Sequence, residues 1–370
     1  MSSAQGITFR RALLSDEDAV MSLGDFYGGR DYLYAHYSDY VQDPDAYPLV
    51  AVAENTVVGF SMTTTFDGGV TVMKRATRVA ETHRGRGLYY MMEEELKKHT
   101  EQHRPQVKYE VLANTISEER LIDRFLSKGY KPVYRRGIIT RLLPLSSSYS
   151  SDCDKDHTHP TIDVKEMSRQ NLSALFEAET SKPRIFPQGR LFNFYLSYRL
   201  CGANIPLLLC ERGGAFFSTD EDAKAASNLQ TEPAQNSNPP IKLQPRSDAS
   251  SADEVDEVSG VRLSADNAHR VAMVTFYYYF PTRTGFMYFL DLYATPEALA
   301  SRDYIHSHLQ RHLLTARRHF PNSRGILTLA HDLHIPRDLI SSTLGQFDIH
   351  DKLPGQEDFQ YLYERETVKP

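Results

Sequence analysis

Residues 79–89 read Val-Ala-Glu-Thr-His-Arg84-Gly85-Arg86-Gly87-Leu-Tyr, and this stretch decides the fold of the 370-residue chain. It lies between a strand-like run over residues 70–80 and a helix-like run whose apolar positions recur every four residues. Glycines at a strand-to-helix junction let the backbone approach a ligand, and the helix start presents unpaired N–H groups. The pattern predicts an anion site suited to a pyrophosphate, to which Arg84 and Arg86 add charge. The alternative is a basic turn that happens to contain glycine.

Around this loop, turn signals and apolar periodicity predict the order β-α-α-β-β-β-α-β-α-β over the first 143 residues. The expected strands are 7–11, 49–53, 57–66, 70–80, 107–113 and 131–143, and the expected helices begin near residues 15, 32, 88 and 116. The triplet Glu54-Asn55-Thr56 is typical of a hairpin turn between the second and third strands. We expect one domain over residues 5–145.

A Ser-rich linker (146–160) leads to a second half (161–370) that repeats the theme more loosely. Its expected elements are strands at 162–164, 271–280, 286–293, 324–329 and 359–363, a pair of strands within 207–217, and helices at 168–176, 296–320 and 338–344. The segment Ala294-Thr-Pro-Glu-Ala, before the long helix, has no glycine. The second half is therefore predicted to be a degenerate copy that binds no cofactor, and instead buttresses the first domain or shapes its acceptor pocket.

The charge balance, 48 acidic against 42 basic residues, is concentrated in one segment. Residues 218–262 hold nine acids, four bases and no Phe or Tyr, a composition that predicts a disordered acidic insert. The nearly neutral remainder argues against a dedicated nucleic-acid binder. We find no apolar run of membrane-spanning length and no secretory signal at Met1, so we expect a cytoplasmic protein with no membrane partner.

The Arg-x-x-Gly loop, placed after a fourth strand and opening a third helix, resembles the acetyl-CoA loop of the GCN5-related N-acetyltransferase (GNAT) superfamily. Longer matches resemble one branch, the vertebrate histidine N-acetyltransferases. They are Tyr27-Gly-Gly-Arg-Asp31-Tyr32-Leu, Asp43-Pro44-Asp45, Arg78-Val79-Ala80, Phe186-Pro-Gln-Gly189, Phe289-Leu-Asp291-Leu, His308-Leu-Gln-Arg-His312 and Phe359-Gln-Tyr361-Leu. The resemblance extends over nearly the whole chain. It implies an α/β fold with a mixed sheet: tandem GNAT-like domains, of which only the N-terminal one carries the acetyl-CoA loop.

The resemblance also implies a binding site for acetyl-CoA as co-substrate. The residues it assigns to the cofactor are Val79, Arg84, Gly85, Arg86, Gly87, Leu88, Tyr89 and Asn114. In this superfamily the strand before the loop splays from its neighbour, and a backbone N–H near Val79 polarises the thioester carbonyl. Asp31 and Tyr32 fall on the acceptor side, where Asp31 would hold an ammonium or imidazolium. Their structural alternative is a helix cap with a packed ring, and for Asn114 it is a helix N-cap.

Three positions depart from the superfamily pattern. Tyr89 stands where Gly or Ala is usual, Arg75 where many members have a Glu general base, and Phe125 where a Tyr often protonates the leaving thiolate. Direct attack by a free amine remains possible, because orientation of two reactants supplies a large part of the rate. A water, His83 or Glu81 is a candidate proton acceptor, and Tyr89, Tyr90 or Tyr130 is a candidate acid. The sequence does not choose among them.

We therefore expect an N-acetyltransferase that moves acetyl from acetyl-CoA to the amine of a small amino acid, by direct attack in a ternary complex. The expected acceptor is the α-amine of L-histidine. Two alternatives stay open: a protein N-terminal or lysine acetyltransferase, and a non-catalytic acyl-CoA-binding protein. His308 and His312 have the spacing of a metal pair, but no acidic third ligand is evident nearby. A solvated or stacked helix face is expected there, and no metal.

Overall fold

Strand β4 (Thr71–Val79) and helix α3 (Leu88–His103) flank the glycine loop in the computed structural model of the chain. The structure describes residues 6–24, 28–115, 119–144, 162–179, 182–222, 262–264, 266–321, 323–350, 353 and 358–367. The linker 146–160 and residues 223–261 of the acidic insert lie outside this set.

The element order predicted for the first half is confirmed. Its other elements are β1 (Ile7–Arg11), α1 (Glu17–Met21), α2 (Leu33–Gln42), β2 (Ala46–Ala53), β3 (Thr56–Phe66), β5 (Tyr109–Asn114), α4 (Glu119–Ser127) and β6 (Lys131–Pro144), with 3-10 turns at Leu14–Asp16 and Glu81–His83. The hairpin between β2 and β3 turns at Glu54 and Asn55, both of which have positive φ. Turn chemistry and periodicity were sufficient here because each strand is separated from the next by a strong turn signal.

The second half contains β7 (Lys165–Glu166), α5 (Arg169–Glu177), α6 (Lys182–Ile185), β8 (Arg190–Asn193), β9 (Leu196–Arg199), α7 (Ile205–Leu208), β10 (Gly213–Thr219), β11 (Val271–Thr282), β12 (Gly285–Ala294), α9 (Arg302–His319), β13 (Arg324–Asp332), α10 (Arg337–Gln346) and β14 (Phe359–Glu366). Further 3-10 turns lie at Gly202–Asn204, Ala268–Arg270 and Ala298–Ala300.

Four local predictions for the second half are wrong. The strand predicted at 162–164 lies at 165–166, and only the second member of the pair predicted within 207–217 is a strand. The first is the helical turn α7, which Pro206 favours because proline suits the first helical turn. The long helix begins at Arg302, where Ser301 caps it. The acidic insert begins after Thr219, since Ser218 and Thr219 are buried in β10.

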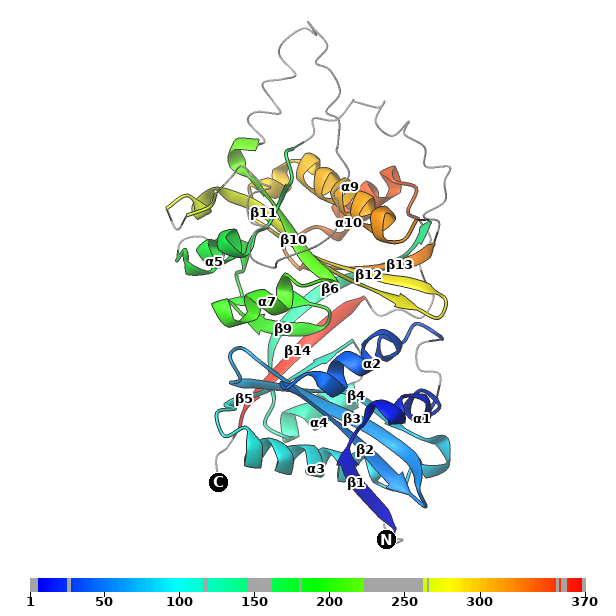
Figure 1. Cartoon of the computed structure of the whole chain (residues 1–370). Helices are drawn as coiled ribbons and strands as arrows, with labels where there is room; N and C mark the ends of the chain where they lie inside the picture. The colour runs from blue at the N-terminus through cyan, green and yellow to red at the C-terminus, as the bar shows by residue number, and fades with distance from the viewer. Residues whose placement is uncertain are drawn as a thin grey trace, which may run out of the picture.

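The strands form one sheet in the order β1-β2-β3-β4-β5-β14-β6-β13-β12-β11-β10-β7, with β8 and β9 as a separate hairpin. The last strand, β14, is inserted between β5 and β6 of the first half, and β6 in turn pairs with β13 of the second. Figure 1 shows β14, in red, lying beside β5. The two halves therefore exchange strands, which the division at residues 145–161 did not predict.

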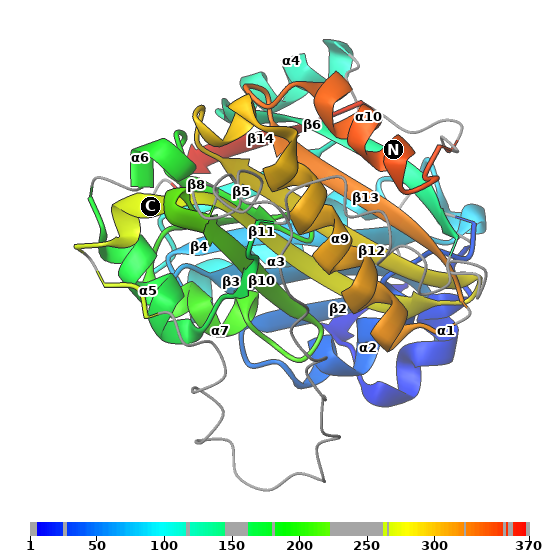
Figure 2. The ribbon, with the colours of Figure 1, turned by 90° about the horizontal axis from the view of Figure 1, so that it is seen from above.

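Helices cover both faces of this sheet. In the first half, α1 and α2 cover one face and α3 the other, where Leu88, Met92 and Leu96 are buried against β2 and β3. In the second half, α9 and α10 pack on one face through an apolar cluster (Figure 2). The opposite face carries α5, α6, α7 and the β8–β9 hairpin. One element, α2, also contacts β11, so it lies between the halves.

Candidate active site

The strands β4 and β5 separate at the position where the site is expected. They pair in parallel for three residues, from Thr71 opposite Tyr109 to Met73 opposite Val111, while β4 continues to pair with β3 as far as Val79. The β3–β4 register shifts beyond Met62, next to Ala76, whose φ is 60°. This value is uncommon for a residue with a side chain and marks a β-bulge. The second part of β4 thus has one edge unpaired among the described strands.

The backbone of Val79 faces that gap. Ala80 N–H donates to Val58 O at 2.9 Å, so the neighbouring pair, Val79 opposite Gly59, is of the non-hydrogen-bonded kind. Its two members turn their N–H and C=O groups away from each other. The C=O of Val79 accepts a hydrogen bond from Arg84 Nε at 3.1 Å. The N–H points from the same edge of β4, where it can donate to a ligand oxygen.

The glycine loop has the geometry of an anion cradle. Gly85 and Gly87 have φ of 73° and 81°, and a Cβ at either position would meet no atom within 4 Å. Gly87 is the N-cap of α3 and provides no side-chain acceptor. Its carbonyl accepts from Tyr90 and Met91, so the N–H groups ahead of Tyr90 point out of the helix start. Arg86 is exposed.

The side chains after the loop do not take part equally. Leu88 is buried under α3, so only its backbone N–H is available to a ligand. The ring of Tyr89 is 40% exposed and packs edge-on against Tyr90 at 5.4 Å. The hydroxyl of Tyr90 accepts a hydrogen bond of 2.6 Å from Arg124 of α4. The start of α3 is thereby linked to α4, across the space into which β4 and β5 diverge.

Asp31 and Tyr32, the residues predicted on the acceptor side, both make contacts within the protein. Asp31 Oδ1 accepts from Leu33 N–H at 2.9 Å and from buried Arg78 at 2.6 Å. Its carboxylate therefore begins α2 and neutralises an arginine. Tyr32 packs edge-on against Tyr40 and Phe194. The cap and packed-ring alternative for this pair is present in the structure.

Asn114 is the last residue of β5 and lies opposite Tyr361 of β14. It is thus at the end of the strand that diverges from β4, with its side chain partly exposed. The residues that would test its alternative role, 116–118 ahead of α4, are outside the described set.

Glu81, His83 and Tyr130, three of the candidate proton-transfer groups, lie in two places. Glu81 and His83 are in the 3-10 turn directly before the loop, where His83 Nδ1 is 2.9 Å from Thr82 Oγ1. Tyr130 is buried, and Arg365 lies over its ring at 4.6 Å. Burial, with Glu110 beside the hydroxyl, raises the pKa of Tyr130. Because Glu110 pairs with Val72, this tyrosine lies beside the closed end of the β4–β5 gap.

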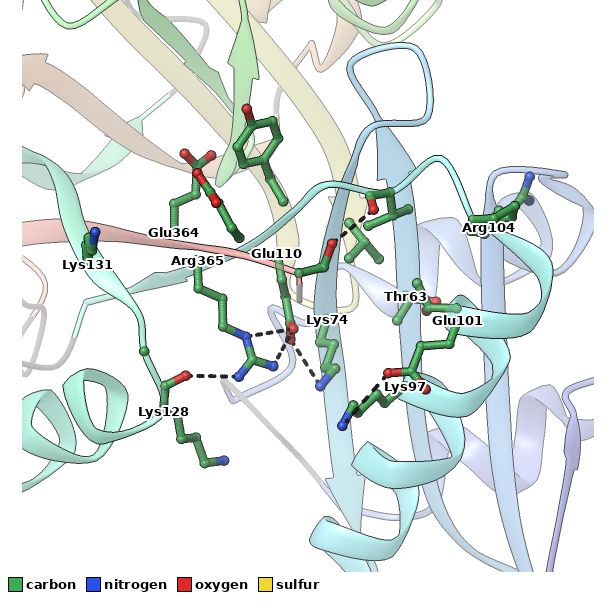
Figure 3. A pocket seen from close by; sticks show the side chains of 18 of the residues that line it. Thr63, Lys74, Lys97, Glu101, Arg104, Glu110, Lys128, Lys131, Glu364 and Arg365 are labelled. Atoms are coloured by element: carbon green, nitrogen blue, oxygen red, sulfur yellow. Dashed lines mark hydrogen bonds and ion pairs between the residues drawn. The ribbon is translucent and has the colours of Figure 1, made fainter. Parts of the chain in front are cut away.

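A cavity of about 770 Å³ contains none of the predicted loop residues. It lies between the C-terminal part of α3 and the α4–β6 connection, where Arg365 and Lys74 converge on Glu110 (Figure 3). Six bases and four acids line it: Lys74, Lys97, Arg104, Lys128, Lys131, Arg365, Glu101, Glu110, Glu364 and Glu366. The cavity wall therefore carries both signs of charge.

The sequence did not predict that Phe194 of the second half lies against Tyr32, on the acceptor side of the candidate site. It forms the two-residue turn of the β8–β9 hairpin with Tyr195, and both have positive φ, 49° and 63°. Such turns favour Asn and Gly, so two aromatic residues there are under backbone strain. Phe194 stacks on Tyr278 of β11 and reaches the Tyr32 ring at 5.5 Å. An aromatic pair between two short apolar runs was the available signal.

His308 and His312 do not lie on a solvated helix face, one of the two arrangements predicted, and the His312 ring packs edge-on against Phe216. Both rings are buried under α9, in a hydrogen-bonded chain that runs from Ser218 through His308, Thr275 and His312 to Tyr288. Burial lowers the pKa of His308 to about 3. Within the part of the chain that the structure describes, no three His, Cys, Asp or Glu side chains form a metal-binding group. None of the helices described there is long and apolar enough to span a membrane.

No protein-family profile matches the chain. In sequence it is 28% identical over 123 residues to probable N-acetyltransferase 16 of Homo sapiens, covering 33% of this chain and 32% of that protein. It is 28% identical over 123 residues to the histidine N-acetyltransferase of Xenopus tropicalis (33% and 37%) and 32% identical over 87 residues to that of Oreochromis niloticus (23% and 26%). The matches span about a third of the length of these relatives. The resemblance expected from the sequence extended over nearly the whole chain.

The fold corresponds over the whole chain. A tandem GNAT protein from the clavulanic acid biosynthesis pathway matches with TM-score 0.50 and 12% identity, over 98% of this chain and 99% of that one. The N-myristoyltransferase of Saccharomyces cerevisiae with bound myristoyl-CoA matches with TM-score 0.52 and 9% identity, over 100% and 81%. With the splayed strands and the glycine loop, these likenesses show that the chain has a tandem GNAT-like fold. In sequence, over about a third of its length, it is a distant and partial homologue of the histidine N-acetyltransferases.

Proposed function

We propose that this protein transfers acetyl from acetyl-CoA to the α-amine of a small amino acid, with L-histidine as the expected acceptor. The observation that carries the proposal is the combination of a β4–β5 gap with an uncapped, glycine-led start of α3 at its open end. The gap would accommodate the thioester, and the start of α3 would bind the pyrophosphate. The names of the partial sequence relatives support the choice of acceptor.

The chain's own groups would act mainly by position. Backbone N–H groups at the start of α3, with Arg84 and Arg86, would bind the cofactor phosphates. The Val79 N–H would donate to the thioester oxygen and stabilise the charge that develops there, an effect worth roughly 10²–10³-fold in comparable sites. The amine would attack the thioester carbon, the C–S bond would break, and CoA thiolate would leave. The amine proton would pass to water or to Glu81 or His83, beside the loop.

Acetyl-CoA-dependent thiol release, screened over the twenty amino acids, polyamines and short peptides, tests this proposal. We expect release with a small amino acid, fastest with histidine, and acetylation at the α-amine by mass spectrometry. Release only with peptides would favour a protein N-terminal or lysine acetyltransferase. Tight acetyl-CoA binding without any turnover would favour a non-catalytic protein, an alternative that Arg75, Phe125 and Tyr89 together motivate.

A further inference from the structure

The side chain of Arg75 enters the acceptor side of the gap from β4. Arg75 lies two residues after the last β4–β5 pair and directly before the bulge at Ala76. Its guanidinium carbon is 5.0 Å from the centre of the Tyr32 ring, 5.3 Å from that of Tyr40 and 5.3 Å from that of Phe194. Two of these rings belong to the α2 region and the third to the strained β8–β9 turn. Both halves therefore build this aromatic cage.

Arg75 differs from the buried arginines of the molecule. Arg78 is paired with Asp31, Arg136 with Asp291, and Arg190 with Glu364. Among the described residues, no carboxylate lies within ion-pair distance of the half-buried Arg75. The aromatic faces attract the guanidinium and the Tyr32 hydroxyl accepts a hydrogen bond from it, but neither carries a charge that balances the arginine. A planar carboxylate is the partner that this fork fits best.

A donor without an acceptor lies against the same rings. His36 of α2 is 5.7 Å from both Tyr40 and Phe194, ring centre to ring centre. Its Nδ1 is 2.9 Å from a guanidinium nitrogen of Arg212, which can only donate, and 3.3 Å from a carboxylate oxygen of Asp39. We take the shorter contact as the hydrogen bond, so that Nδ1 accepts and Nε2 carries the proton. Nε2 is buried and has no hydrogen-bond partner among the described residues. Burial and the charge of Arg212 lower the pKa of His36 to about 4, which keeps the ring neutral.

We propose that Arg75, with the Nε2–H of His36, is the receptor for a free carboxylate on the acceptor, and that the protein acts on α-amino acids rather than on amines or peptide N-termini. The inference rests on the proposed function, whose acceptor it narrows. A carboxylate fixed on Arg75 holds the α-amine, one carbon away, beside the part of β4 that faces the gap. The rings around it suit an aromatic or imidazole side chain.

The test compares histidine with histamine and histidinamide, which keep the imidazole and the amine but lack the carboxylate. We expect kcat/KM for histidine to exceed that for either analogue by roughly 10²-fold, since a charge-assisted pair is lost. Arg75→Met removes that preference by lowering the histidine value about 10²-fold, mainly through KM, with less than a threefold change for histamine. Arg75→Lys restores part of it. Arg283→Met, which removes an exposed arginine over Tyr34, is the matched control and keeps the preference.

Binding measurements keep the outcome independent of turnover. Acetyl-CoA affinity of Arg75→Met, measured by calorimetry, is expected to equal that of the unmodified protein, which shows that the variant is folded. In the presence of CoA, histidine should raise the melting temperature, histamine should not, and Arg75→Met should abolish the histidine effect. Absence of CoA release with every acceptor refutes the proposed function, whereas equal rates, or equal binding, of histidine and histamine refute the role of Arg75.

Discussion

The two halves of the molecule share an order of elements, and they differ where strands diverge. In the first half, β4 and β5 pair over three residues and then separate. In the second, the corresponding strands β12 and β13 pair over seven residues, from Phe286 opposite Gly325 to Leu292 opposite His331. A sheet without a gap offers no N–H like that of Val79 to a thioester. Closure of this gap is one physical reason why the second half is expected to bind no cofactor.

The helices that follow these strands differ in the same sense. Helix α3 begins at Gly87, which has no side-chain acceptor, behind a loop that carries two arginines. Helix α9 begins at Ser301, whose hydroxyl accepts from the N–H of Asp303, an acidic residue in the first turn. At least one N–H group at the start of α9 is thus already satisfied, and a carboxylate lies beside it. The helix cap is therefore a second difference between the halves, at the position where a phosphate is expected to bind.

The largest expected effect is on the free energy of unfolding, and it tests how strongly a buried ion pair between the two halves stabilises the protein. Arg136 of β6 forms an ion pair with Asp291 of β12 and donates to Gln360 of β14 at 2.6 Å, all of them buried. Arg136→Met should lower the free energy of unfolding by about 3–5 kcal/mol, because a buried carboxylate loses its partner. The measurement is urea unfolding. Arg136→Met combined with Asp291→Leu should be less destabilised than Arg136→Met alone, and an additive loss would show that the pair is not coupled.

The second effect converts the start of α3 into that of α9. In Gly87→Asp, the introduced carboxylate would accept from the first N–H groups of α3 and repel the cofactor phosphates. We expect acetyl-CoA to bind at least about 10²-fold more weakly, equivalent to about 2.7 kcal/mol, as measured by calorimetry. Gly189→Asp is the matched control, because Gly189 also has positive φ and open space around its Cβ position. Unchanged affinity in Gly87→Asp would place the phosphates elsewhere.

The sequence was sufficient for the first half because each element there carries its own local signal. It could not place β14, since the pattern of residues 359–363 predicts a strand but not the two strands between which it inserts. It could not pair Arg75 with Phe194, which are brought together by a turn of the other half. The burial of His308 could have been predicted from the sequence. With Ile305, Leu309 and His312 it lies on one helical face, but histidine at such positions is read as polar.

The smallest expected effect is a loss of stability at low pH, which should differ between the cores under the two long helices. Helix α3 packs through Leu88, Met92 and Leu96, whereas α9 buries His308 and His312 among its apolar residues. The pKa of His308 is lowered by burial to about 3, from an ordinary value near 6.5. Between these values the unfolded chain binds a proton that the folded chain does not. The contribution of neutral, buried His308 to the free energy of unfolding is therefore complete above about pH 6.5 and is lost as the pH falls.

One such histidine should reduce the free energy of unfolding by about 2 kcal/mol between pH 7 and pH 5. His308→Gln should be less stable at pH 7, because its hydrogen bonds to Ser218 and Thr275 are disturbed, yet it should lose correspondingly less on acidification. His350→Gln, at an exposed position after α10, should keep the slope of the unmodified protein. Hydrogen exchange should also increase in α9 before α3 as the pH falls. Equal pH dependence of His308→Gln and the unmodified protein would mean that the buried histidine does not set this acid sensitivity.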